Sequence, residues 1–433
     1  MKVVVIGAGI VGVASALWAR RAGHNVTLVD RAGPAAGASF GNGAVLARCS
    51  VVPVTGPGLA ARAPRMALDP GQPLFLRWAR LPGMLPWLAR YLSHANARDT
   101  RRIAAALAHI VGDSVAQHAA LARGTPAERF LHPSDYAYVY RDRAAWEADA
   151  FAWGLRAEAG FVPEIVEGAA VREREPSLGP EAGLMAVLSD HGIVLNPGGY
   201  VAALVEAFER EGGTFRRAEV LALALEGDRV AAVETDGGRL PCDRAVLAAG
   251  ALSGALMARL GLPVPLAAER GYHLTWRDPP VRPTMPLMLA GAKFVATPTL
   301  EGGRGGGLRC AGIVELGGMD DARSPAALAL MRRRAREAFP GLVTEPDGEW
   351  LGLRPAPSDS LPLIGEVRAT GVIAAFGHHH VGLTGGPKTG RLVADLIDGR
   401  SATVGRHGAV DTTPFDPQRF ARGPRWARWG DTT

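Results

Sequence analysis

The stretch Lys2-Val-Val-Val-Ile-Gly-Ala-Gly-Ile-Val-Gly12 decides how the start of this chain folds. Its opening, Val3–Ile6, is apolar and β-branched, which is typical of a strand buried in a parallel sheet. From Ile10 to Ala22 small and apolar residues recur at helical spacing, and a second apolar run over Val26–Val29 ends at Asp30. The pattern predicts a strand, a glycine turn, a helix and a second strand, which together form a βαβ unit.

Each glycine of this turn has its own task if the unit binds a dinucleotide. Gly7 permits the tight turn, Gly9 lets a diphosphate approach the backbone at the positive end of the helix, and Gly12 lets helix and strand pack closely. The Asp30 carboxylate can accept hydrogen bonds from ribose hydroxyls, and its charge argues against the 2′-phosphate of NADP. The alternative is an ordinary glycine-rich turn. No second motif of this kind follows, a pattern common among FAD proteins, so FAD is the expected cofactor.

Composition limits the class of protein. The 433 residues are 48% hydrophobic and 21% charged, which suits a folded chain with two interleaved domains. The N-terminal apolar run is about five residues, too short for a signal peptide or a spanning helix, so we expect a cytoplasmic protein. Cys49, Cys242 and Cys310 are far apart and are expected to be free thiols. The net charge of +6 leaves open contact with an anionic membrane surface; no nucleic-acid partner is expected.

The rest of the chain alternates between helical, strand and glycine-rich patterns. Residues 31–58 predict a long functional loop. Residues 73–123 predict two amphipathic helices whose arginines face either solvent or a membrane or partner. Strands are expected at 136–140, 214–223, 229–235, 239–248, 265–276, 294–298, 308–315 and 371–375. Helices are expected at 143–159, 200–208, 325–338 and 387–398, the last after a glycine-rich loop over 377–386.

We therefore expect an α/β fold with an α+β second domain, in which a mixed-sheet substrate domain is inserted into a Rossmann-like FAD-binding domain. The FAD-binding domain is predicted to comprise residues 1–60, 190–260 and 350–433. The substrate-binding domain is predicted to comprise residues 61–189 and 261–349.

Seven motifs in order resemble those of the D-amino-acid oxidase superfamily of FAD-dependent amine oxidoreductases, and most closely those of bacterial D-amino-acid dehydrogenases. They are the opening glycine turn, Ala-Ser-Phe-Gly-Asn-Gly at 38–43, Asn-Pro-Gly-Gly-Tyr at 196–200, Ala-Ala-Gly at 248–250, Gly-Tyr-His at 271–273, Gly-Leu-Arg-Pro at 352–355 and Gly-His-His-His-Val-Gly-Leu-Thr at 377–384. Residues 411–420 resemble the closing segment of that family. The resemblance covers nearly the whole chain.

The resemblance implies residues for the substrate. Arg354 stands where the family places its carboxylate-binding arginine, and a guanidinium can make two parallel bonds to a carboxylate; the alternative is a structural ion pair with an acid such as Glu349. Tyr272 and His273 belong to a strand that faces the flavin in relatives, so Tyr272 either covers the substrate or packs in the core. His379 stands where relatives often have glycine and is expected to reach the substrate pocket, which leaves the identity of the substrate open.

The resemblance also implies a flavin site and no metal. Backbone amides of the glycine-rich loop would face the pyrimidine edge of the ring, where a positive helix end stabilises the negative charge gained on reduction. Three adjacent histidines at 378–380 without an acid or cysteine at ligand spacing argue against a metal site. The expected cofactor contacts are Gly7, Ala8, Gly9, Ile10, Val11, Gly12, Asp30, Arg31, Ser39, Asn42, Gly43, Val220, Ala249, Gly250, Gly377, Gly382, Leu383 and Thr384.

The implied reaction is oxidative deamination of a D-amino acid, with a cyclic imino acid such as hydroxyproline among the candidates. Hydride passes from Cα to flavin N5, and the resulting imine is hydrolysed to a 2-oxo acid and ammonia. The electrons then go to a quinone in dehydrogenase relatives or to O₂ in oxidase relatives. The motif sequences are more similar to those of the dehydrogenases, which favours a dehydrogenase. Two alternatives stand beside this reading: an oxidase of glycine or N-methyl amino acids such as sarcosine, and a non-catalytic flavin-binding subunit. The oligomeric state stays open.

Overall fold

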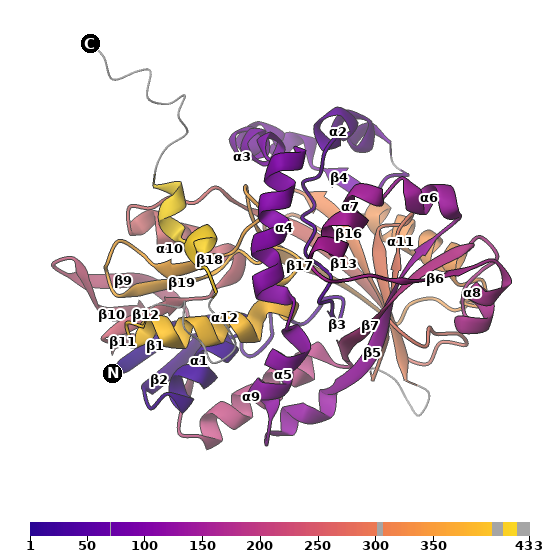
Figure 1. Cartoon of the computed structure of the whole chain (residues 1–433). Coiled ribbons are helices and arrows are strands. Elements are labelled where there is room, and N and C mark those ends of the chain that lie inside the picture. The colour runs from indigo at the N-terminus through magenta and orange to yellow at the C-terminus, as the bar shows by residue number, and fades with distance from the viewer. Residues whose placement is uncertain (70, 301–305, 401–409, 422–433) are drawn as a thin grey trace, which may run out of the picture.

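The computed structural model describes residues 1–433 apart from 70, 301–305, 401–409 and 422–433 (Figure 1). The described residues form two large β-sheets, one of six strands and one of ten, and a smaller sheet of three strands. Figure 1 shows the six-stranded sheet on the left, beside the N-terminus, and the ten-stranded sheet on the right. The α/β fold with a second, mixed sheet that the sequence predicts is confirmed.

The six-stranded sheet carries the βαβ unit. All neighbouring strands run parallel except β18 and β19. In spatial order the strands are β18 (Leu363–Glu366), β19 (Val372–Phe376), β12 (Arg244–Leu247), β1 (Lys2–Ile6), β2 (Asn25–Asp30) and β8 (Thr214–Arg217). Alternate residues of β1 enter two different cores. Val3 and Val5 pack against α1 (Ile10–Arg21), α9 (Pro197–Arg210) and α12 (Gly382–Ile397), whereas Val4 and Ile6 face the small sheet and α10 (Ser253–Arg259).

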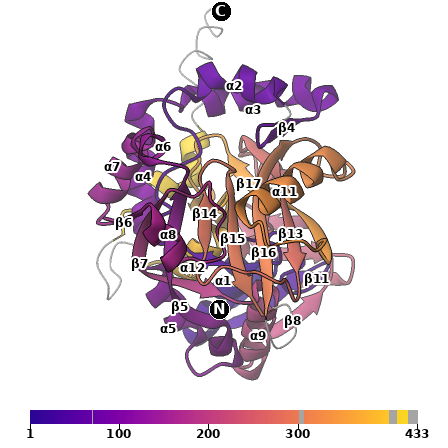
Figure 2. The ribbon, with the colours of Figure 1, turned by 90° about the vertical axis from the view of Figure 1, so that its right-hand side faces the viewer.

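The ten-stranded sheet is mixed. Its main path runs β17 (Gly348–Pro357), β13 (Leu266–Trp276), β16 (Gly307–Leu316), β15 (Phe294–Thr299), β14 (Leu287–Leu289), β5 (Leu131–Tyr140), β7 (Leu184–Val194) and β3 (Val45–Leu46). Figure 2 shows its strands β14, β15 and β16 side by side. β4 (Leu74–Leu76) pairs with β16, and β6 (Glu164–Glu167) pairs with β7. Helix α11 (Pro325–Ala338) packs on one face through apolar residues such as Leu330 and Met331.

Several predicted elements have different bounds in the structure. The two helices expected over residues 73–123 are the short strand β4 followed by α3 (Leu81–Ser93), α4 (Ala97–Val111) and α5 (Ser114–Ala122). The helix expected over 143–159 is broken into α6 (Arg143–Glu147) and α7 (Ala150–Glu158). The strand expected over 214–223 is split between two sheets, because β9 (Val220–Glu226) joins β10 (Arg229–Thr235) and β11 (Gly238–Pro241) instead of continuing β8.

The remaining elements complete the described chain. They are α2 (Leu59–Leu68), α8 (Ala169–Arg174) and short 3-10 helices at Trp78–Arg80, Pro126–Phe130, Gly250–Leu252, Thr413–Phe415 and Pro417–Phe420. Within the described ranges no helix is long and apolar enough to cross a membrane.

The glycine-rich loop predicted over 377–386 is shorter in the structure, because α12 already begins at Gly382 and only residues 377–381 precede it as a loop. Two glycines inside α12 permit close packing. A Cβ at Gly390 would lie 2.5 Å from the backbone carbon of Ala14, and one at Gly385 would lie 2.5 Å from Ile110. Glycine is costly inside a helix but permits this close approach of α12 to its neighbours, so the local propensity for a loop is overridden by tertiary contact.

Candidate active site

One cavity of about 1580 Å³ extends from the glycine turn to the ten-stranded sheet. The turn after β1, the loop over 36–44 and the residues that follow β12 line one part of it. Side chains of β13, β16 and β17 and the start of α12 line another. The cavity therefore connects the predicted dinucleotide motif to the strands that carry the predicted substrate residues.

The three glycines of the turn after β1 have different surroundings. Gly7 has a φ of +105°, and a Cβ there would lie 2.5 Å from the Ala248 carbonyl oxygen. A Cβ on Gly12 would lie 1.8 Å from the Gly7 carbonyl oxygen, so α1 and β1 touch at these glycines. Gly9 differs, because its backbone is extended and a Cβ would meet only the Ser39 hydroxyl, at 3.1 Å. Gly9 is thus free for a ligand to approach.

The N-terminus of α1 is open to an anion. The N-cap residue is Gly9, which has no side chain to accept a hydrogen bond from the first amides of the helix, and no acidic residue lies in the first turn. The Ile10 amide donates to the Ser39 hydroxyl at 2.9 Å. The Asp30 carboxylate accepts hydrogen bonds from the amides of Ala8, Ala32 and Gly33 at 2.8, 2.8 and 3.0 Å. A carboxylate has about four lone-pair sites, so Asp30 keeps capacity for a ribose hydroxyl.

Three side chains from the ten-stranded sheet hold the carbonyls of residues 40–43. Arg309 donates to the carbonyls of residues 40 and 42 at 3.0 and 3.1 Å, His273 Nδ1 donates to that of residue 41 at 3.0 Å, and Thr297 donates to that of residue 43 at 2.8 Å. Burial and the nearby Arg309 charge lower the pKa of His273 to about 3, so its ring is neutral. The ring stacks on Trp350 with centroids 5.1 Å apart and borders a separate cavity of about 570 Å³. The structure thus places His273 against the loop of residues 40–43, at the smaller cavity and not among the residues that line the large one.

Ser39, Asn42 and Gly43, the loop residues predicted to contact the cofactor, line the large cavity. Tyr272 does not line it. Asn42 uses its side chain within the loop, donating to the Ser39 carbonyl at 2.6 Å and accepting from the Ala44 amide at 2.7 Å. Tyr272 is 1% exposed, donates its hydroxyl to the buried carboxylate of Glu315 and accepts from the Ser324 amide. The predicted contacts that line the large cavity are Gly7, Gly9, Ile10, Val11, Asp30, Arg31, Ser39, Asn42, Gly43, Val220, Ala249, Gly250, Gly377, Gly382, Leu383 and Thr384.

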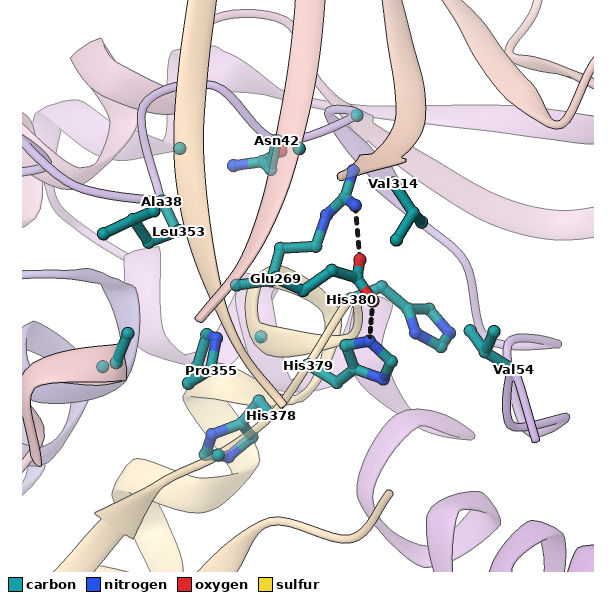
Figure 3. Close-up of a pocket in the computed structure, with 18 of the residues that line it drawn as sticks. Ala38, Asn42, Val54, Glu269, Val314, Leu353, Pro355, His378, His379 and His380 are labelled. Carbon is teal, nitrogen blue, oxygen red and sulfur yellow. Dashed lines mark hydrogen bonds and ion pairs between the residues drawn. The ribbon is translucent and has the colours of Figure 1, made fainter. Parts of the chain in front are cut away.

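A buried carboxylate joins two predicted substrate residues in the cavity wall (Figure 3). Glu269 Oε1 accepts from Arg354 Nη1 at 2.6 Å, and Glu269 Oε2 accepts from His379 Nε2 at 2.7 Å. Glu269 and Arg354 face each other across the β13–β17 ladder, and the His379 amide donates to the Pro355 carbonyl at 3.0 Å. The Arg354 guanidinium lies against Gly271, where a Cβ would be 2.4 Å from Cζ. The partner of Arg354 is therefore Glu269 and not Glu349, which pairs with Arg332.

The charges around Glu269 keep it ionised. Burial opposes ionisation, but the His379 and Arg354 charges and hydrogen bonds outweigh it and hold the Glu269 pKa well below its ordinary value. Sequence reasoning missed Glu269. The available signal was its spacing, because Glu269 and Gly271 share one face of a strand that is expected to face the cofactor.

The histidine run is distributed over three environments. His379 has a φ of +51°, a left-handed conformation that favours glycine and that costs other residues of order 1 to 3 kcal/mol. The His378 ring is hydrogen-bonded to the Thr389 hydroxyl at 2.8 Å, and burial lowers its pKa to about 4. The His380 ring is exposed, borders the cavity and lies with its centroid 5.0 Å from that of His379. Among the described residues no cluster of three or more potential metal ligands is found.

Replacing Glu269 with glutamine is expected to flatten the acid dependence of stability. A depressed carboxyl pKa in the folded state stabilises the wild type above the ordinary value of 4.5, and this contribution is lost as pH falls. Between about pH 6 and pH 3 the wild type should therefore lose about 2 kcal/mol of unfolding free energy that Glu269→Gln does not lose. Denaturant titrations at both pH values measure the difference. Equal losses in the two proteins would contradict an ionised Glu269.

The glycine turn, the open helix ends and the connecting cavity define a dinucleotide-binding flavoprotein fold. A family model described as DAO, FAD dependent oxidoreductase, matches residues 2–396. The chain belongs to this family of FAD-dependent oxidoreductases, and FAD is its cofactor.

Relatives match over nearly the full length. A D-amino-acid oxidase of Bradyrhizobium diazoefficiens is 37% identical, with 96% of this chain and 98% of the relative covered. A D-amino acid dehydrogenase of Paramagnetospirillum magneticum is 32% identical, with coverages of 94% and 97%. Among solved structures, glycine oxidase from Geobacillus kaustophilus has a TM-score of 0.73 at 20% identity, with coverages of 96% and 99%. L-proline dehydrogenase from P. horikoshii has a TM-score of 0.71 at 19% identity, with both chains 98% covered.

The residues of the cavity fit FAD. The N-terminus of α1, where Gly9 has no side chain to cap the helix, offers the positive helix end to a diphosphate, and Asp30 lies at the end of β2, where a ribose is expected. The first turn of α12 is a second helix N-terminus without a side-chain cap, and its residues Gly382, Leu383 and Thr384 border the same cavity. The two positive helix ends are suited to the two polar parts of the cofactor.

Proposed function

We propose that this protein catalyses the FAD-dependent oxidative deamination of a D-amino acid. The observation that carries the proposal is the Arg354–Glu269–His379 cluster in the wall of the cavity that also contains the dinucleotide motif (Figure 3). The two relatives described above are both named for D-amino acids. When bound, FAD supplies the hydride acceptor, and the protein supplies binding and orientation.

Arg354 is proposed to bind the substrate carboxylate with the side of its guanidinium that the cluster leaves open. Among the described residues, its hydrogen bonds run from Nη1 to Glu269 and to the Ile313 carbonyl. Nε and Nη2 can then make two parallel hydrogen bonds to a carboxylate. Glu269 and Gly271 fix the position of the guanidinium. Tyr272 lies outside this arrangement, and His273 is proposed to shape the flavin loop instead of contacting substrate.

His379 is proposed to influence which side chain the substrate carries. Its ring is held against Glu269, and His380 lies edge-on to it with ring centroids 5.0 Å apart. The His379 imidazole occupies space that a glycine at position 379 would leave open, and the His380 ring borders the same cavity. This arrangement favours a small or cyclic side chain, and a cyclic imino acid such as hydroxyproline stays one candidate.

We propose that the chain is divided into the two domains given above. We also propose that the protein is a dehydrogenase that passes electrons to a quinone rather than to O₂.

Contact with a membrane surface would be made by the cap formed by α2, Trp78–Arg80 and α3. In this cap Leu68, Trp78 and Leu85 are 73%, 55% and 53% exposed, and several arginines lie beside them. Apolar side chains flanked by arginines suit an anionic bilayer.

An anaerobic screen of D- and L-amino acids tests the proposed function. D-Amino acids should bleach the bound flavin, and their L-enantiomers should not. Re-oxidation in air should then give much less than one peroxide per turnover if the protein is a dehydrogenase; near-stoichiometric peroxide would favour an oxidase. If glycine or sarcosine were the best substrate, the amine-oxidase alternative would replace the proposal. Failure of every amino acid to bleach the flavin would favour a non-catalytic subunit.

A further inference from the structure

We propose that His118 positions the first turn of α12 by making a hydrogen bond that Pro387 cannot make. The inference rests on the proposed function, because it concerns the turn of α12 that borders the cavity in which FAD is expected to bind. His118 lies in α5, 265 residues before Leu383 in the chain, and it is fully buried. It was not among the residues that the sequence indicated.

Pro387 leaves a gap in the hydrogen bonding of α12. In an α-helix the amide of each residue donates to the carbonyl four residues earlier. Pro387 lies inside α12, four residues after Leu383, and proline has no amide hydrogen. The Leu383 carbonyl therefore has no donor from the helix at this step. His118 Nε2 lies 2.9 Å from the Leu383 carbonyl oxygen and fills the gap.

The neighbours of His118 determine its protonation and its tautomer. Burial lowers the pKa of His118 to about 4, although the bond to Leu383 opposes this, so the ring is neutral near pH 7. A carbonyl oxygen can only accept, so Nε2 carries the hydrogen. Nδ1 then accepts from the Tyr200 hydroxyl, which lies 2.8 Å away. The imidazole is held at both nitrogens and cannot rotate without losing a buried hydrogen bond.

Fixing the Leu383 carbonyl also fixes an amide at the cavity. The Leu383 carbonyl and the Thr384 amide belong to one planar trans peptide and point in opposite directions. Leu383 and Thr384 both border the cavity, at the positive end of α12. A donor held on the α5 side therefore sets the direction of the Thr384 amide on the other side. It also polarises the peptide, which makes that amide a stronger donor.

The test exchanges one donor for another. We would measure the FAD dissociation constant and the flavin midpoint potential of the wild type, His118→Phe, Pro387→Ala and the double variant. His118→Phe should weaken FAD binding about tenfold and lower the potential, because the Leu383 carbonyl loses the donor that the imidazole supplies. Pro387→Ala should stay within about twofold of the wild type. The double variant should recover both quantities, since an alanine at position 387 would supply the missing backbone amide.

The outcomes separate this inference from the proposed function. A wild type that binds no FAD would overturn both. A wild type that binds FAD and is reduced by a D-amino acid, with His118→Phe unchanged in affinity and potential, would overturn the inference alone. A purely structural role predicts a lower melting temperature for His118→Phe without recovery on adding Pro387→Ala. If the double variant does not recover, or does not fold, the inference is also wrong. His118→Gln, which keeps an N–H donor, should lie between wild type and His118→Phe.

Discussion

A Gly9→Val variant is expected to fold and to lose FAD. Gly9 has an extended backbone, and a Cβ would meet only the Ser39 hydroxyl at 3.1 Å, so the protein itself tolerates a side chain there with a small adjustment. The diphosphate would not, because the valine would occupy its place at the N-terminus of α1. Losing charge-assisted hydrogen bonds of this kind should weaken FAD binding by about two orders of magnitude or more. Flavin content after gel filtration and titration with FAD measure the loss.

Gly12→Ala is the matched control. Its Cβ would lie 1.8 Å from the Gly7 carbonyl oxygen, so helix and strand would have to separate. We expect this variant to lose stability whether or not FAD is present. Full retention of FAD by folded Gly9→Val would show that the diphosphate does not bind at this turn.

Arg354→Ala is expected to raise the KM for the amino acid strongly. In the proposed complex Arg354 and the substrate carboxylate form a charged, hydrogen-bonded pair. Truncating one partner of such a buried pair costs about 2 to 5 kcal/mol of binding free energy. The variant should also be less stable, because Glu269 is 4% exposed and loses its cationic neighbour. Steady-state kinetics and denaturant titration measure the two effects.

A double variant separates substrate binding from stability. Arg354→Ala with Glu269→Gln removes the unpaired buried charge, so stability should recover in part, whereas KM should stay high. Glu269→Gln alone should keep KM near that of the wild type or lower it, since Arg354 would be less neutralised. If KM in Arg354→Ala is unchanged, the arginine has only a structural role and the substrate carboxylate binds elsewhere.

Local patterns were sufficient to predict the first part of the fold. The strand, glycine turn and helix at residues 2–21 are determined by neighbours in sequence, and the structure agrees with them to within one residue. The helix expected at 325–338 was also found with the same bounds. The start of α12 was not predictable, because its glycines satisfy contacts with residues of α1 and α4 that lie far away in the chain.

The candidate site was only partly predictable for a related reason. Glu269 and Arg354 are opposite one another because of the register of β13 and β17. The two residues are 85 positions apart in the chain, and the sequence of neither strand determines how the two strands align. The β13–β16 pairing also shifts between Gly271 and Tyr272, so alternation along the strand could not decide which of Tyr272 and His273 faces the cofactor. The role of His118 could not be predicted either, because the sequence does not show that α5 packs beside the first turns of α12.

The most direct test is to titrate the purified wild type with FAD and then add a D-amino acid without oxygen. Our account predicts one FAD per chain, bound tightly enough to survive gel filtration, and loss of the flavin colour with the D-enantiomer but not with the L-enantiomer. A folded protein that stays colourless and takes up no FAD would contradict the assignment of the cavity, and with it the proposed chemistry.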